Sequence, residues 1–107
     1  MSILDWLKSR FSRRAKSLNG YRDGMAKASK GDFAGAVVDY SATIQAPNTP
    51  NDVLGMALYN RALAYSAIHE DEKAAEDLTR VLSMRGLPEK ISTAASQRRE
   101  RIRRRQA

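Results

Sequence analysis

The sequence predicts an all-α fold, an α-α superhelix of two helical hairpins with a lead helix before them and a capping helix after them. Apolar residues recur at helical spacing along most of the 107 residues, and no useful stretch alternates with the period of two typical of strands. A pattern of residue types also repeats after 38 positions. A fixed period of this size indicates hairpins that stack and bury each other's apolar faces within one domain, residues 1–107.

The two copies of this repeat share the chemical class of their residues more often than the identity of the residues. A set of five residues recurs as a second set: Ala36, Val37, Asp39, Tyr40 and Ile44 correspond to Ala74, Ala75, Asp77, Leu78 and Leu82. Gly24 likewise recurs as Ala62, and Pro50 recurs as Pro88. The two sets therefore predict the second helix of each hairpin.

The N-terminal part of the chain predicts two helices. A basic lead helix over 2–15 has its apolar residues on one stripe: Ile3, Leu4, Leu7 and Phe11. Asn19-Gly20 indicates a break after it. A helix over about 20–30 then ends at Gly31, a common C-terminal stop.

The remaining helices begin and end at recognisable residues. Asp32 is expected to cap the helix that carries the first repeated set. Thr49 is expected to cap the next helix, with Pro50 at its first position, over about 50–68. Further helices are predicted over 71–84, before a stop at Gly86, and over 88–104, with an end that frays beyond Arg98.

Residues 18–86 resemble the tetratricopeptide repeat family, with repeat 1 at 18–47 and repeat 2 at 50–86. The segment that begins Gly31-Asp-Phe-Ala-Gly-Ala resembles a second half-repeat, and 57–65 resembles a first half-repeat. The resemblance places small residues at close helix crossings: Gly24, Ala36, Ala62 and Ala74. The chain departs from the family in its period, which is 38 rather than the usual ~34 residues, and in His69, which replaces the usual turn glycine.

In this family the first helix of each hairpin lines a concave groove that holds a partner's peptide or helix. The resemblance assigns six residues to that groove: Tyr21, Met25, Met56, Tyr59, Asn60 and Leu63. The alternative is that they are core residues. Tyr21 and Met25 replace the Lys and Asn of the family's carboxylate clamp, so that function does not transfer. The sequence therefore favours a non-catalytic protein–protein interaction module or adaptor.

The net charge of +7 is concentrated at the two ends of the chain, while residues 23–84 are acidic overall. An anionic membrane surface or nucleic acid is therefore the alternative partner. The candidate contact residues are Trp6, Lys8, Arg10, Arg13, Arg14, Arg98, Arg99, Arg101, Arg103, Arg104 and Arg105. For the lead helix three alternatives stay open: a cap on the stack, a membrane-surface helix and an organellar targeting segment.

Several classes of function are disfavoured. The chain has no cysteine and no apolar run of membrane-spanning length, which fits a cytoplasmic protein. The single histidine, His69, lies in a predicted turn with no nucleophile near it in sequence. The acidic residues from Glu70 to Asp77 are typical of a helix start rather than of a metal site. We therefore expect no enzyme activity, no cofactor and no small-molecule substrate, and we consider a homo-oligomer open.

Overall fold

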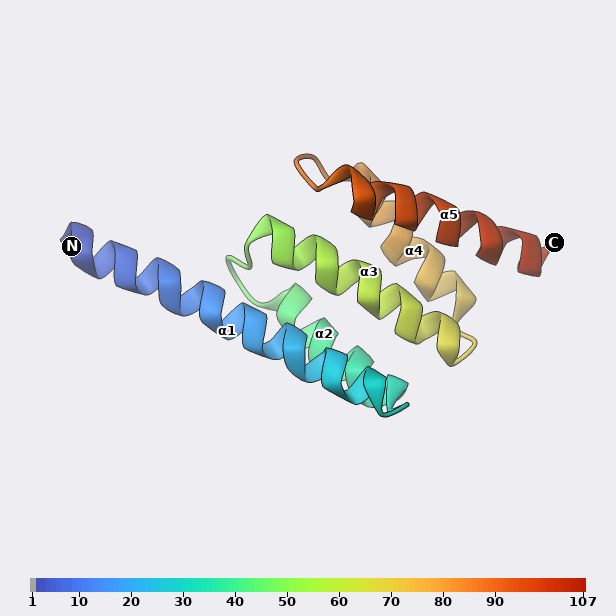
Figure 1. The fold of residues 1–107 in the computed structure, drawn as a ribbon, viewed down its shortest axis with the longest axis horizontal. Coiled ribbons are helices and arrows are strands. Elements are labelled where there is room, and N and C mark those ends of the chain that lie inside the picture. The colour runs from blue at the N-terminus through green and yellow to red at the C-terminus, as the bar shows by residue number, and fades with distance from the viewer. Residues whose placement is uncertain (1) are drawn as a thin grey trace.

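The computed structural model describes residues 2–107, and this part of the chain contains five helices and no strand (Figure 1). Their bounds are α1 (Ile3–Ser29), α2 (Phe33–Gln45), α3 (Asn51–Ala67), α4 (Asp71–Ser83) and α5 (Glu89–Gln106). Each helix packs against the next along the chain, as in a stack of helical hairpins. The prediction of an all-α fold is confirmed.

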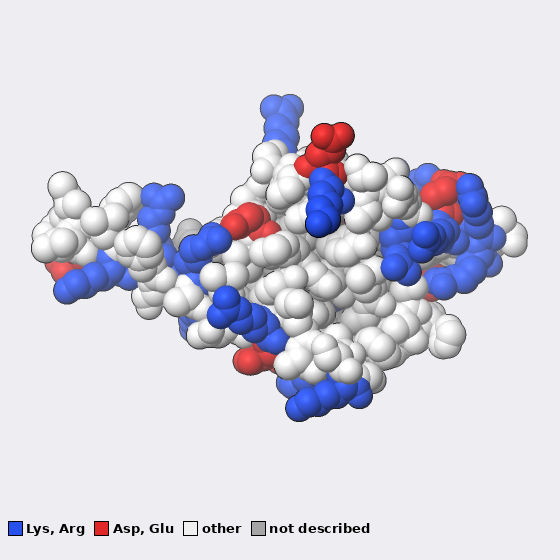
Figure 2. Space-filling view, in the orientation of Figure 1, with Lys and Arg blue, Asp and Glu red and all other residues white. Residues whose placement is uncertain are grey.

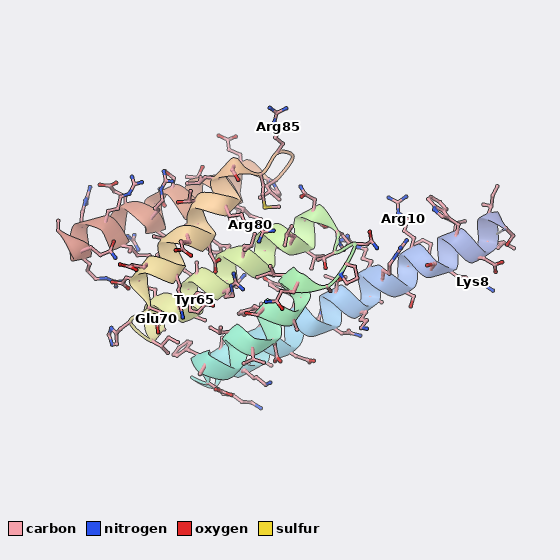
Figure 3. All side chains as sticks on the ribbon, turned by 180° about the vertical axis from the view of Figure 1, so that it is seen from behind. Lys8, Arg10, Tyr65, Glu70, Arg80 and Arg85 are labelled. Carbon is pink, nitrogen blue, oxygen red and sulfur yellow. The ribbon has the colours of Figure 1, made fainter. Side chains whose placement is uncertain are left out.

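The helices form two layers. Helix α3 contacts both α1 and α5, whereas no Cα atom of α2 lies within 8 Å of a Cα atom of α4. The views from the two sides agree: α1, α3 and α5 lie in front in Figure 1, and α2 and α4 lie in front when the molecule is turned round (Figure 3). The first helices of the two hairpins, α1 and α3, therefore form one continuous face together with the capping helix α5.

The 38-residue repeat of the sequence is also a repeat of burial. Four pairs of positions are buried in both copies: 24 and 62, 36 and 74, 40 and 78, and 43 and 81. Leu78 and Val81 belong to one core cluster and Ala36 and Tyr40 to another. The two hairpins therefore bury equivalent positions although most of the side chains differ.

Small residues allow the helices of a hairpin to approach closely. A Cβ atom added to Gly24 would lie 2.5 Å from Cε1 of Tyr40, so the Tyr40 ring occupies the space above this glycine. Ala36, Ala62 and Ala74 are fully buried. These four residues lie where the family resemblance predicted close crossings.

The two hairpin turns share one backbone arrangement. At the first turn, the Asp32 N–H donates to the Lys27 carbonyl (2.9 Å) and Gly31 has a φ of 83°. At the second, the Glu70 N–H donates to the Tyr65 carbonyl (2.9 Å) and His69 has a φ of 65°. This pairing is the Schellman motif, which favours glycine at the left-handed position. His69 thus occupies the turn-glycine position, as the sequence indicated.

Of the predicted helix starts and stops, the cap at Asp32 is confirmed, because its carboxylate accepts a bond from the Gly35 N–H (2.9 Å). Helix α4 ends at Ser83 with Met84 extended, before Gly86, which has a φ of 79° in the following loop. Thr49 does not cap α3: its hydroxyl donates to the carbonyls of Thr43 (2.8 Å) and Ala46. Pro50 occupies the cap position instead.

The predicted break at Asn19-Gly20 is also wrong, because α1 is one helix of 27 residues. Gly20 faces α2, and a Cβ atom there would lie 2.7 Å from Oγ1 of Thr43. A glycine inside a helix costs only about 1 kcal/mol relative to alanine. Helix packing therefore accounts for Gly20, and the lead helix and the first helix of repeat 1 are continuous.

The two ends of the stack differ. At the C-terminal end, α5 buries Ala95 and Ile102 in the core cluster of α3 and α4 and thereby covers it. It stays helical through Gln106, so the expected fraying beyond Arg98 is absent. At the N-terminal end, Ile3, Leu4 and Phe11 are 77%, 67% and 69% exposed. Their apolar stripe does not cap the stack.

A buried ion pair connects three helices. The Arg61 guanidinium donates to both carboxylate oxygens of Asp77 (2.8 and 2.7 Å), joining α3 to α4, and to the Ser41 hydroxyl of α2 (3.1 Å). Both charged side chains are largely buried. The hydrogen bond to Asp77 raises the pKa of Arg61, so the guanidinium stays charged across the physiological range.

We expect Arg61→Met to lower the free energy of unfolding by about 3–5 kcal/mol, because it leaves the Asp77 carboxylate buried without a partner. The double variant Arg61→Met/Asp77→Leu should lose clearly less, since no orphaned charge remains. Urea denaturation of the wild type, both single variants and the double variant measures the coupling. Additive losses would contradict it.

We expect His69→Gly to raise the free energy of unfolding by roughly 0.5–1 kcal/mol, because a left-handed φ strains any side chain other than glycine. The matched control is Gly31→Ala, which should lower stability by about 1–2 kcal/mol at the equivalent turn. Thermal and chemical denaturation check both values. A destabilised His69→Gly variant would show that the imidazole makes a compensating interaction.

Candidate functional site

The candidate site is the face formed by α1, α3 and α5, to which α1 and α3 contribute the six residues that the sequence assigned to a groove. In Figure 2 the centre of this face carries few charges, while Lys and Arg gather over α5 at one end and along α1 at the other. Met25 is 43% exposed, and the other five residues are half-buried. All six therefore keep accessible surface.

A hydrogen-bonded group fixes three of these residues. The Asn60 amide nitrogen donates to the Tyr21 hydroxyl of α1 and to the Met56 carbonyl one turn earlier in α3, each at 2.9 Å. The Tyr21 ring packs beside that of Tyr40, with 5.9 Å between centroids and 40° between planes. The structure thus connects Tyr21, Met56 and Asn60 across the α1–α3 contact.

The other three residues have different surroundings. Tyr59 packs against the core cluster that contains Leu58 and Leu78, so only part of its ring reaches the surface. Leu63 is half-buried and lies one turn after Tyr59 on α3. Met25 is the most exposed of the six. The face therefore combines one flexible, exposed side chain with anchored aromatic residues.

Burial changes the acidity of the tyrosines beneath this face. Loss of hydration raises the pKa of Tyr40 to about 12, with smaller contributions from Tyr21 and Asp39. Burial raises the pKa of Tyr21 as well. Both phenols are therefore neutral in the physiological range, and Tyr21 keeps the hydroxyl that accepts from Asn60.

The predicted N-terminal contact residues lie in the first half of α1, whose N-terminal end projects beyond the other helices (Figure 1). The Arg10 guanidinium lies 5.2 Å from the centre of the Trp6 ring. Arg14 makes a bidentate ion pair with Asp52 of α3 (2.8 and 3.1 Å), which raises the pKa of Arg14 and lowers that of Asp52. Lys8 and Arg13 are exposed.

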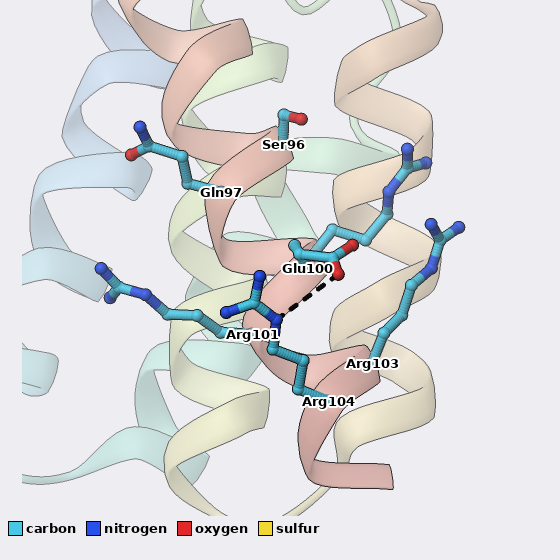
Figure 4. A pocket seen from close by; sticks show the side chains of 7 residues that line it. Ser96, Gln97, Glu100, Arg101, Arg103 and Arg104 are labelled. Carbon is cyan, nitrogen blue, oxygen red and sulfur yellow. Dashed lines mark ion pairs between the residues drawn. The ribbon is translucent and has the colours of Figure 1, made fainter. Parts of the chain in front are cut away.

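The C-terminal arginines are partly engaged within the fold. Arg105 pairs with Asp71 (2.8 Å), Arg104 pairs with Glu100 (3.5 Å; Figure 4), and Arg99 donates to the Thr79 hydroxyl (3.3 Å). Arg98, Arg101 and Arg103 make no ion pair within residues 2–107. Side chains from Ser96 to Arg104 line a shallow polar hollow on α5 (Figure 4). Four of the predicted contact residues line this hollow together: Arg99, Arg101, Arg103 and Arg104.

The described residues hold no group of three or more His, Asp or Glu that could bind a metal ion. His69 is exposed at the α3–α4 turn. None of the helices described here combines the length and the hydropathy needed to cross a bilayer.

Sequence reasoning missed two features of this region. The Arg61–Asp77 pair joins residues on different helices, and the only signal was the recurrence of Asp39 as Asp77. The second missed feature is a hollow between α1 and α2, and Ser17, Gly20 and Ala42 are among the residues that line it. The small residue Gly20 was the sequence signal for this hollow, but from the sequence it was interpreted as a helix break.

The fold and this face define an all-helical stack of hairpins, which fits the tetratricopeptide-like class. The chain is similar to the Photosystem I assembly protein Ycf3 of Parasynechococcus marenigrum (strain WH8102), with 36% identity over 62 residues. The match covers 58% of this chain and 35% of the relative, so the chain spans only about a third of that protein. No protein-family model and no solved structure matches the chain at a significant level.

We expect the free energy of unfolding to fall by roughly 2–3 kcal/mol as the pH rises from about 10 to 12, because the folded state binds the Tyr40 proton more tightly than the unfolded chain does. This contribution is fully present below pH 10. Urea denaturation between pH 9 and 12 measures it, with Tyr40→Phe as the control that lacks the titrating group. Equal pH slopes in both proteins would contradict the assignment to Tyr40.

Proposed function

We propose that this protein is a non-catalytic interaction module that docks a helix or extended segment of a partner protein on the face of α1 and α3. The observation that carries the proposal is an accessible, largely uncharged patch in the centre of that face, in which Asn60 donates to the Tyr21 hydroxyl and to the Met56 carbonyl. Aromatic residues and Met are enriched where proteins bind one another.

The chemistry of the six residues suits a peptide or helix. Met25 is exposed and unbranched, so it can adapt to the shape of a partner. Tyr21 and Tyr59 are held by packing, so little side-chain entropy is lost when a partner covers them. Cations at both ends of the face would accelerate encounter with an acidic partner.

The similarity to an assembly protein supports the same class of function. The name of that relative describes the assembly of a protein complex, which is work done by contact between proteins. Because the match covers 35% of the relative, we transfer only the general role in protein assembly and no particular partner.

We expect the double variant Met25→Ala/Tyr59→Ala to weaken partner binding at least tenfold, about 1.4 kcal/mol, because large side chains at the centre of an interface carry much of the binding energy. The test is affinity capture from the native cell extract followed by titration of each captured protein. The matched control is Val38→Ala, which removes an apolar side chain that is 66% exposed on α2, in the other layer.

Thermal denaturation of the double variant is required alongside, because Tyr59 also packs against the core. A folded double variant that binds as tightly as the wild type would contradict the proposal. So would an equal loss of binding in Val38→Ala.

A further inference from the structure

The N-terminal part of α1 is an amphipathic helix whose apolar side chains are largely exposed in the described part of the chain. We call residues 3–13 the N-terminal overhang, since Arg14, which pairs with Asp52, is the first residue of α1 to make an ion pair with another helix. Figure 1 shows this part of α1 running past the ends of the helices packed beside it. Within the described residues, three of its apolar side chains are more exposed than any other large hydrophobic residue: Ile3, Leu4 and Phe11.

The overhang is a formed helix rather than a loose end. It is continuous with the packed part of α1, and the Ser2 hydroxyl accepts a bond from the Asp5 N–H (3.1 Å) at its start. At 3.6 residues per turn, Ile3, Leu4, Leu7 and Phe11 lie on one side of the cylinder. The fold therefore holds Ile3, Leu4 and Phe11 in solvent in a fixed conformation, with Leu7 half-buried between them.

Cations border this stripe on both sides. Figure 3 shows Lys8 and Arg10 pointing to opposite sides of α1, and both are exposed. Arg13 adds a third cation, while Asp5 is the only acidic residue of the overhang. Long basic side chains at the edge of an apolar stripe can reach headgroups while the stripe enters the acyl region.

We propose that the N-terminal overhang lies on the surface of an anionic lipid bilayer, with Ile3, Leu4, Leu7 and Phe11 buried at the interface and Lys8, Arg10 and Arg13 against lipid phosphates. An anionic bilayer offers both an apolar interior for the stripe and phosphates for the cations on its two edges. A second copy of the chain would place its own cations against these. Nucleic acid would match the charge but offer no apolar interior for Leu4 and Phe11.

Trp6 provides a direct probe, because it is the only tryptophan of the chain and lies beside the stripe. The full chain is titrated with vesicles of phosphatidylcholine alone and with vesicles containing about one-third phosphatidylglycerol, and Trp6 emission and co-sedimentation are recorded. We expect a blue shift and binding with the anionic vesicles. Substituting Lys8→Gln/Arg10→Gln should weaken that binding roughly thirtyfold, since each of the two cations contributes about 1 kcal/mol near such a surface.

The apolar stripe is tested separately with Leu4→Ser/Phe11→Ser. We expect at least a tenfold loss of affinity for anionic vesicles, because two large side chains no longer enter the interface. Val38→Ser is the matched control, since Val38 is exposed to a similar degree on α2. Both variants should keep the wild-type melting temperature, because none of these side chains is buried in the fold.

Four results would overturn the proposal. The first is the absence of a Trp6 shift with anionic vesicles, which would indicate that the stripe binds a protein rather than a bilayer. The second is equal binding to both kinds of vesicle. The third is unchanged binding of Leu4→Ser/Phe11→Ser, which would show that charge alone accounts for the binding to vesicles. The fourth is a dimer in sedimentation equilibrium that Phe11→Ser converts to a monomer, which would assign the stripe to a second copy.

Discussion

The close approach of the two helices within each hairpin is the constraint on which the rest of the structure depends. Gly24 admits the Tyr40 ring, and in the second hairpin Ala62 and Ala74 are fully buried in one core cluster. At such short separations, main chains and small side chains fill the interface, and larger residues beside them complete the core. Arg61 can then reach both Asp77 of α4 and Ser41 of α2, so that one guanidinium ties the second hairpin to the first.

This constraint explains why so much of the fold could be predicted from the sequence. A close crossing requires a small residue, and a left-handed turn favours glycine, so Gly24, Ala36 and Gly31 carry structural information in their identity. The prediction was wrong where one residue type serves two purposes. Gly20 is small because Thr43 of α2 lies against it, yet a glycine after asparagine is equally typical of a break. The sequence alone does not give the distance between Gly20 and Thr43, which decides between the two interpretations.

The candidate site was less accessible to prediction for a related reason. The six residues could be assigned to the first helices of the hairpins only through the resemblance to the tetratricopeptide repeat family. Their contacts could not be assigned. The bond from Asn60 to Tyr21 joins residues 39 positions apart, and the Arg61–Asp77 pair joins residues on two helices. Each depends on how the helices are rotated and spaced in the folded stack, which no local pattern records.

Helix α1 connects the two surfaces for which we propose a function. It carries the exposed stripe of the overhang at its N-terminal end and Tyr21 and Met25 of the docking face nearer its C-terminal end. A helix of 27 residues is about 40 Å long and does not bend freely. If both proposals hold, a bilayer that binds the overhang would fix the direction in which the docking face points. The continuity of α1 through Asn19 and Gly20 would then have a functional consequence, because a break there would let the two surfaces move independently.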